Sequence, residues 1–144
     1  MVFSELFCAK RSSGCKASDA VTADGEAPYF QRVRDVTELD AAVRSAGRPV
    51  MLDFYADWCV SCKEMERFTF NDPRVRARLD KALLLQVDVT RNSAADRELL
   101  KRYNLFGPPG ILFFDAQGRE LASLRVIGYQ DTAHFLDSLS SAGL

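Results

Sequence analysis

The chain has 144 residues, which suits one domain with one hydrophobic core. Its 19 Lys and Arg residues nearly balance its 20 Asp and Glu residues, so the net charge of −1 does not indicate a nucleic-acid partner. No apolar run approaches the ~20 residues of a membrane-spanning helix, and residues 1–7 lack the basic start of a signal peptide. We therefore expect the chain itself to be soluble. If the protein works outside the cytoplasm, we expect its targeting segment or membrane anchor to lie outside this sequence.

Residues 1–28 show no clear hydrophobic periodicity and are rich in Ser, Gly, Ala and Lys around Cys8 and Cys15. This composition is typical of a flexible leader, derived from expression or left over from a linker. A domain of this size needs no disulfide scaffold. We interpret Cys8 and Cys15 as inert leader thiols, which could still oxidise together or cross-link two chains. The remainder of the sequence is predicted to form one folded domain over residues 29–144.

The first half of this domain alternates predicted strands and helices. Residues 29–33 favour a short edge strand, residues 37–46 a helix after a capping box at Thr37-Glu38-Leu39-Asp40, residues 50–56 a buried strand, and residues 59–68 a second helix. A third helix begins at Asn71-Asp72-Pro73, since Pro is favoured in the first helical turn.

The second half continues this alternation and ends with a hairpin and a helix. The expected elements are a buried strand at residues 83–89, a helix from Ser93 to Tyr103, a break at residues 107–110, hairpin strands at residues 111–114 and 120–127, and a last helix through residue 139 capped by Asp131 or Thr132. The order predicts an α/β fold with a central mixed β-sheet flanked by helices on both faces.

The sequence Cys59-Val60-Ser61-Cys62 follows a predicted buried strand and opens a helix, a position typical of a redox motif. At the first turn of a helix, Cys59 can face solvent with Cys62 beneath it, close enough for a small disulfide ring. The unpaired N–H groups and the positive end of the helix dipole stabilise the Cys59 thiolate. We therefore assign Cys59 as the nucleophile and Cys62 as the resolving thiol.

Two other interpretations of this motif remain open. A C-x-x-C sequence also supplies half of a zinc site, but a zinc site needs two more ligands, and the sequence offers only His134, Cys8 and Cys15 for them. A redox-inactive binding domain is the second alternative, although both thiols are present. We expect no metal and no cofactor besides the redox-active disulfide of Cys59 and Cys62.

The residues around the motif resemble a known family. Residues 53–63, Asp-Phe-Tyr-Ala-Asp-Trp-Cys-Val-Ser-Cys-Lys, are similar to the active-site stretch of the thioredoxin superfamily, which implies the thioredoxin fold. Residues 55–64, with Phe68-Thr69-Phe70, resemble more specifically the C-terminal periplasmic domain of the DsbD family of bacterial transmembrane thiol–disulfide interchange proteins. Further matches lie at residues 84–86, 88–90, 99–101, 111–115 and 128–129, within a region from about residue 29 to residue 139.

This resemblance implies a protein-disulfide reductase that works as an electron relay. Such a domain takes electrons from the membrane-embedded domain of its parent protein, which cytoplasmic thioredoxin feeds. It passes them to the N-terminal periplasmic domain, which reduces partners such as disulfide isomerases and cytochrome c maturation proteins. We therefore expect a location at the periplasmic face of the bacterial inner membrane. A free-standing thioredoxin-like reductase is the main alternative, and a non-catalytic binding module with the same fold is the other.

Two acids are candidates for proton handling near the cysteines. Asp53 lies in an otherwise apolar strand, so we expect burial to raise the pKa of its carboxyl group. In the thioredoxin family the matching acid lies beneath the cysteines and handles the proton of the resolving thiol. Glu66 lies one helical turn after Cys62, and the resemblance implies a second acid there that raises the cysteine pKa. The plainer alternatives are a solvent-reaching acid at a strand end and a solvated helix residue.

Pro109 is the candidate cis-proline, which the resemblance places opposite the cysteines, where it shapes the substrate groove. In this sequence Pro108 replaces the usual aliphatic residue of the family and Gly110 replaces the usual threonine. Family members pair the backbone of the residue before the cis-proline with the partner chain. Because Pro108 has no N–H group, we expect one such hydrogen bond to be absent and docking to be weaker or more permissive.

Three aromatic residues are predicted to line the rim of the site as further substrate contacts. Trp58 precedes the nucleophile directly, while Tyr55 and Phe106 are placed at the same rim. Simple packing is the alternative for all three. Lys63 and His134 are interpreted as solvated surface residues.

Overall fold

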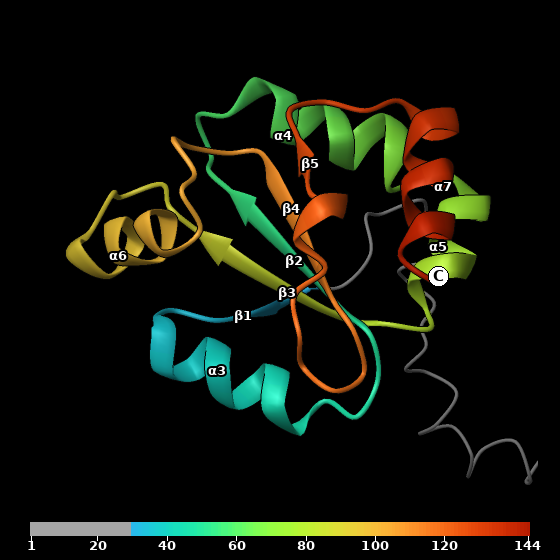
Figure 1. Cartoon of the computed structure of the whole chain (residues 1–144). Helices are drawn as coiled ribbons and strands as arrows, with labels where there is room; N and C mark the ends of the chain where they lie inside the picture. Colours follow the sequence, from blue (N-terminus) through green and yellow to red (C-terminus); the bar gives the residue numbers. More distant parts are fainter. Residues whose placement is uncertain (1–29) are drawn as a thin grey trace, which may run out of the picture.

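A computed structural model describes residues 30–144 (Figure 1). The predicted leader at residues 1–28, with Cys8 and Cys15, lies outside the described residues. Within residues 30–144, five strands form one mixed sheet in the order β1-β3-β2-β4-β5. They are β1 (Gln31–Arg32), β2 (Val50–Tyr55), β3 (Leu83–Asp88), β4 (Gly110–Phe114) and β5 (Val126–Ile127). β3 runs parallel to β1 and β2, whereas β4 is antiparallel to β2 and β5.

Helices cover both faces of the sheet, as the order of the predicted elements requires (Figure 1). The helices are α3 (Val36–Ser45), α4 (Val60–Glu64), α5 (Pro73–Leu79), α6 (Ala94–Arg102) and α7 (Thr132–Ser141). α3 and α6 contact each other on one side of the sheet, and α5 and α7 contact each other on the other side. The predicted α/β fold with a central mixed sheet is therefore confirmed.

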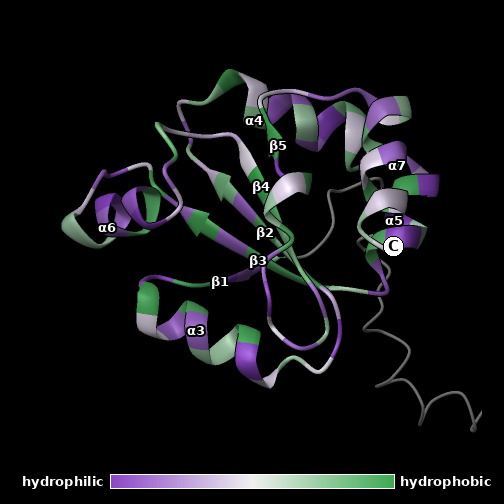
Figure 2. Ribbon diagram, in the orientation of Figure 1, coloured by the Kyte–Doolittle hydropathy of each residue, from purple (hydrophilic) through white to green (hydrophobic). Residues whose placement is uncertain are grey.

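Side chains of β2 alternate between two hydrophobic cores, because successive residues of a strand point to opposite faces. One core joins Leu52 of β2 to Leu39 of α3. The other core joins Met51 of β2 to Phe135 of α7. Figure 2 shows the hydrophobic residues concentrated on the strands and on parts of the helices, with hydrophilic residues on other helix surfaces. Asp53 shares the period of Met51, so its carboxyl group lies on the α5 and α7 side of the sheet.

The start of α3 differs from the prediction. The capping residue is Asp35 rather than Thr37, and its carboxylate accepts a hydrogen bond from Glu38 N at 2.9 Å. Glu38 in turn accepts from Arg34 N at 2.7 Å. Asp is a stronger N-cap residue than Thr, and the cap lies two residues before the predicted one.

The second hairpin strand is shorter than predicted. Within residues 120–127, Glu120 forms a single bridge to Phe114, residues Ala122–Leu124 form a 3-10 turn (η3), and only β5 is paired in the sheet. Arg125 holds the segment between Glu120 and β5 in place. Its guanidinium group donates to the carboxylate of Glu120 and, at 2.7 Å, to the carbonyl of Tyr103. These contacts lie 5 and 22 residues apart in the sequence.

The helix that begins with the cysteine motif changes its winding after one turn. α4 continues into the π-helical segment η2 (Met65–Thr69), in which Phe70 N donates to Met65 O at 2.7 Å, five residues earlier. Contacts with the loop before α7 accompany this wider turn: Thr69 donates to the carbonyl of Gln130 at 2.7 Å. None of the helices within residues 30–144 has the length and apolar character needed to cross a membrane.

Candidate functional site

Cys59 and Cys62 form a disulfide at the start of α4, shortly after the end of β2. Cys59 is the N-cap residue of α4, with extended backbone angles, and its Sγ accepts a hydrogen bond from Cys62 N at 3.1 Å. The Cα atoms of the two cysteines are 5.3 Å apart, within the usual range for a disulfide. The cap position therefore places the Cys59 sulfur over the N–H groups of the first turn, where a negative charge on sulfur is stabilised.

The exposure of Cys59 is lower than predicted. Cys59 is 6% exposed and Cys62 is 4% exposed, so the expected contrast between an outer and an inner thiol is small in this bonded form. In this form the Cys59 sulfur is bonded to the sulfur of Cys62 and accepts a hydrogen bond from Cys62 N. Across residues 30–144, no three His, Cys, Asp or Glu side chains converge in a way that could hold a metal.

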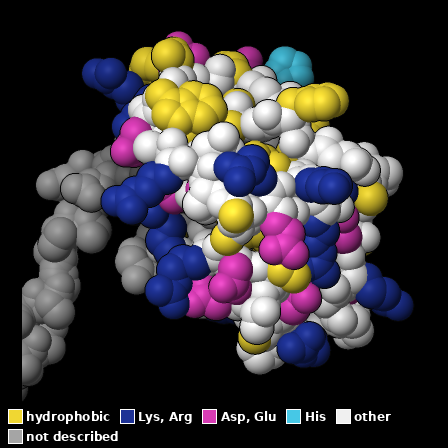
Figure 3. Space-filling view, turned by 90° about the vertical axis from the view of Figure 1, so that its left-hand side faces the viewer, with side chains coloured by type: hydrophobic (Ala, Val, Ile, Leu, Met, Phe, Trp, Pro, Cys, Tyr) yellow, Lys and Arg dark blue, Asp and Glu magenta, His cyan; other side chains and the backbone are white. Residues whose placement is uncertain are grey.

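Exposed hydrophobic side chains lie next to the disulfide. Trp58 and Val60 flank Cys59 in the sequence. Ile127 pairs with Gly110, the residue after the cis-proline. Trp58 is 60% exposed, and its Nε1 donates to the carbonyl of Thr90 at 3.2 Å, which fixes the indole ring beside Cys59. Figure 3 shows hydrophobic side chains gathered at the upper end of one face, above an area of mixed charge. Among residues 30–144 the large exposed hydrophobic residues are Trp58, Val60, Phe68, Phe106, Ile127 and Tyr129.

Tyr55, predicted at the rim, lies mostly beneath it. Its side chain is only 7% exposed, and its hydroxyl group donates to Asp57 Oδ1 at 3.0 Å. Two cations lie against its ring: Arg32 Cζ is 5.9 Å and Lys63 Nζ is 5.4 Å from the ring centroid. Tyr55 thus supports the segment that carries Trp58, rather than offering an open contact surface.

The Pro108–Pro109 peptide bond is cis in the structure. Strand pairing places it at the active end of the sheet, because Gly110 lies opposite Phe54 near the end of β2, just before the motif. The carbonyl of Pro109 accepts a hydrogen bond from Gly128 N at 3.2 Å. A Cβ atom on Gly110 would lie 3.2 Å from a methyl group of Leu105, which fits the small residue found there.

Asp53 is buried, as predicted from its place in an apolar strand. The residue is 5% exposed, and Gln86 Nε2 donates to its Oδ2 atom at 2.9 Å. Burial raises the pKa of the Asp53 carboxyl group to about 7, and the negative charge of Glu66 adds to this effect. The Gln86 hydrogen bond and the charge of Arg32 oppose it, since both stabilise the carboxylate.

Glu66 lies in η2 and is half-buried. Burial raises the pKa of its carboxyl group as well, the positive charges of Lys63 and Arg32 oppose this shift, and the negative charge of Asp57 supports it. The charge of Glu66 acts on Asp53, so the structure brings the two predicted acids into one electrostatic group. Because η2 is π-helical from Met65 onward, the ideal helical spacing used to place Glu66 does not apply beyond that residue.

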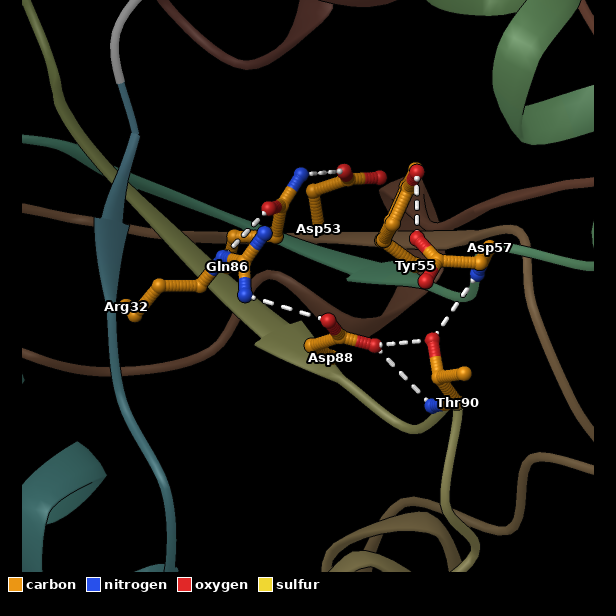
Figure 4. A network of polar contacts seen from close by, with 7 residues as sticks. All are labelled: Arg32, Asp53, Tyr55, Asp57, Gln86, Asp88 and Thr90. Atoms are coloured by element: carbon orange, nitrogen blue, oxygen red, sulfur yellow. Dashed lines mark hydrogen bonds and ion pairs between the residues drawn. The ribbon is translucent and has the colours of Figure 1, made fainter.

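Sequence reasoning missed two polar residues of the site. Gln86 is buried in β3 and bonds Asp53, and Arg32 of β1 bonds Gln86 (Figure 4). The signal for Gln86 was the one used for Asp53, a polar residue inside an apolar strand. Arg32 carried no such signal, because its role depends on strand pairing. His134, predicted on the surface, is exposed beside Asp131.

Comparison with known proteins shows which family the chain belongs to. The thioredoxin-like domain family matches residues 37–143. Crystal structures of the DsbD C-terminal domain of Neisseria meningitidis, oxidised and reduced, are 34% and 35% identical to this chain, with TM-scores of 0.66 and 0.64. The chain covers 99% of each. The chain belongs to the thioredoxin-like domains, as a C-terminal domain of the DsbD type. A thioredoxin from Thermus thermophilus is 26% identical, with a TM-score of 0.64.

Full-length relatives give the same assignment. The thiol:disulfide interchange protein DsbD of Ralstonia nicotianae is 58% identical over 130 residues, which are 88% of this chain and 21% of that protein. DsbD of Cronobacter sakazakii is 56% identical over 111 residues, 76% of this chain and 19% of that protein. The chain thus spans about a fifth of the length of these relatives. The DsbD-type assignment agrees with the position of the Cys59–Cys62 disulfide at the start of a helix.

Proposed function

We propose that this domain relays electrons by dithiol–disulfide exchange within a DsbD-type membrane protein. It receives them from a membrane-embedded domain and passes them to an N-terminal periplasmic domain, at the periplasmic face of the inner membrane. The observation that carries the proposal is the disulfide of Cys59 and Cys62 at a helix start, with the exposed hydrophobic residues Trp58 and Val60 on either side of Cys59 in the sequence. The chain matches only about a fifth of the length of its DsbD relatives, which supports its being one domain of a larger protein.

The exchange proceeds in two displacements that conserve electrons. In the dithiol form, the Cys59 thiolate attacks one sulfur of the partner disulfide, the partner S–S bond breaks, and the released partner sulfur takes up a proton. The Cys62 thiolate then attacks the Cys59 sulfur of the mixed disulfide, and the second partner sulfur leaves and is protonated. Two electrons have moved to the partner, and the Cys59–Cys62 disulfide has formed.

Asp53 is the group suited to handle the proton of Cys62. It lies buried on β2, and burial sets the pKa of its carboxyl group to about 7, so both of its forms are populated at neutral pH. A general base works best when its pKa lies near the working pH. As Cys62 becomes a nucleophile, the Asp53 carboxylate accepts its proton, and the proton returns when the disulfide is reduced again.

The test mixes the reduced domain with the oxidised N-terminal periplasmic domain of Ralstonia nicotianae DsbD. Trp58 is the only tryptophan of the chain and adjoins Cys59, so its fluorescence reports the redox state of the site. We expect rapid exchange in the native protein, a trapped mixed disulfide with Cys62→Ser, and no exchange with Cys59→Ser.

Three outcomes contradict the proposal. Partner binding without partner reduction, unaffected by Cys59→Ser, indicates a binding module. Equal rates with the N-terminal domain and with an unrelated protein disulfide such as insulin indicate a free-standing reductase. A strongly oxidising potential of the Cys59–Cys62 pair in glutathione buffers contradicts a reducing relay.

A further inference from the structure

Three side chains from three strands form a single row beneath the active site. Strand pairing places Arg32 of β1 opposite Gln86 of β3, and Gln86 opposite Asp53 of β2. Residues paired in this way project from the same face of the sheet. Figure 4 shows the row, which leads from the exposed edge strand to the buried acid.

Hydrogen bonds join the row end to end. Arg32 Nε donates to Gln86 Oε1 at 2.8 Å, and Gln86 Nε2 donates to Asp53 Oδ2 at 2.9 Å. A glutamine amide has one accepting and one donating end, whereas a guanidinium group only donates. Arg32 can therefore bond only the oxygen of Gln86, and this leaves the NH2 group of Gln86 to face Asp53.

The guanidinium group of Arg32 is itself held in place. Its Nη1 atom donates to Asp88 Oδ2 at 3.1 Å. Asp88 accepts from the backbone N of Thr90 at 2.9 Å and from the hydroxyl group of Thr90, and the same hydroxyl oxygen accepts from Asp57 N at 2.8 Å. The position of Arg32 is thus tied to the segment that leads into the cysteine motif.

We propose that Arg32 is a positioning residue that fixes the side-chain amide of Gln86 in the orientation that donates to the Asp53 carboxylate. With Arg32 absent, the amide is free to turn over. In the turned orientation, Gln86 presents its oxygen to Asp53, and a hydrogen bond between them then requires Asp53 to be protonated.

The consequence concerns the proton affinity of Asp53, and its link to catalysis rests on the proposed function. The charged groups acting on Asp53 are Glu66 of η2, which favours the protonated form, and Arg32, which favours the carboxylate. Lys63 and Asp57 act on Glu66. Arg32 therefore acts on Asp53 in two ways, through its charge and through Gln86, and an experiment has to separate the two.

A double-mutant cycle makes this separation. The pKa of Asp53 is measured by carbon-13 NMR of its carboxyl group in the oxidised full chain, where the bonded cysteines do not titrate. We expect Arg32→Met and Gln86→Leu each to raise this pKa by about one to two pH units, the size expected from losing one hydrogen bond to the charged form. In the Gln86→Leu background, we expect Arg32→Met to have a clearly smaller effect.

Two control variants complete the test. Arg34→Met removes a nearby arginine that bonds Glu38 instead of Gln86, and we expect the pKa of Asp53 to stay unchanged. Arg32→Lys keeps the charge but not the planar fork that reaches Gln86 and Asp88 together, so we expect a partial shift. The proposal is overturned if Arg32→Met has the same effect with and without Gln86, because Arg32 then acts by charge alone, or if it has none.

The outcome is separable from that of the proposed function. The NMR titration needs no partner and no turnover. If the pKa of Asp53 moves in Arg32→Met while the pH profile of disulfide exchange does not, the positioning role stands and the proton-handling role of Asp53 fails.

Discussion

Gln86 Nε2 lies 2.9 Å from Asp53 Oδ2, and the two residues face each other on adjacent parallel strands. Both side chains are buried, with exposures of 4% and 5%. A buried carboxylate is costly unless it is hydrogen-bonded, and this bond partly offsets the cost. Because the bond offsets only part of the cost of burial, the pKa of Asp53 stays near 7, and both its protonated and its charged form are populated at neutral pH.

The native domain is expected to lose stability as the pH rises from about 4 through 7, and Asp53→Asn is expected to abolish this loss. Burial raises the pKa of Asp53 from 3.8 to about 7 in the folded chain. The folded state thus holds this proton more tightly than the unfolded state. The stabilisation is complete below about pH 4 and is lost as the pH rises through 7, by roughly 4 kcal/mol in total. Urea unfolding of the oxidised domain between pH 4 and pH 9 measures this change. A difference between native protein and Asp53→Asn that does not vary with pH contradicts the prediction.

Replacing Glu66 by Gln is expected to lower the pKa of Asp53, because the negative charge of Glu66 disfavours the Asp53 carboxylate. The change should stay below about one pH unit, since Glu66 is only half-buried and water screens the pair. Carbon-13 NMR of the Asp53 carboxyl group gives the value. Glu64→Gln removes an exposed acid two residues away and is the control. An unchanged or higher pKa in Glu66→Gln excludes Glu66 as the second acid.

Replacing Trp58 by Ala is expected to weaken partner docking. Trp58 is 60% exposed beside the disulfide, and central tryptophans in interfaces often contribute 2 kcal/mol or more. We expect the KM for the oxidised N-terminal domain to rise about 30-fold with little change in kcat. Phe68→Ala removes another exposed aromatic residue, nine positions after Cys59 in sequence, and serves as the control. Equal effects of both variants would show that Trp58 has no special role in docking.

Replacing Pro108 by Val is expected to strengthen partner binding. Pro108 has no N–H group to offer a partner strand, and Val restores one next to the cis-proline. One net hydrogen bond of about 0.5–1.5 kcal/mol corresponds to about 2- to 12-fold tighter binding. Calorimetry with the N-terminal domain measures the affinity. Pro108→Ala restores the same donor with a smaller side chain, so both variants should bind more tightly. Unchanged binding in both means that residue 108 makes no backbone contact with the partner.

Elements with strong local signals were predicted well. α5 begins after Asp72 with Pro73 in its first turn, and α6 begins at Ser93 with a reciprocal capping box. The apolar run of β2 predicted a fully buried strand, as the structure shows. In each case neighbouring residues decide the structure, since caps and buried strands depend on side chains a few positions apart.

Elements that depend on distant contacts were predicted poorly. The second hairpin strand is interrupted where Arg125 bonds Tyr103, a residue 22 positions away. The helix after Cys62 widens next to the loop at Gln130. Tyr55 was placed at the rim, whereas its burial follows from packing that the local sequence does not reveal.

The sequence alone determined the redox motif of Cys59 and Cys62, because its chemistry needs two thiols at a fixed short spacing at a helix start. It also placed Asp53 in the interior, because the surrounding strand is apolar. Only the tertiary structure decided what surrounds that acid. Arg32, Gln86 and Asp53 come from three strands that are distant in sequence, and strand register alone brings them into one hydrogen-bonded row.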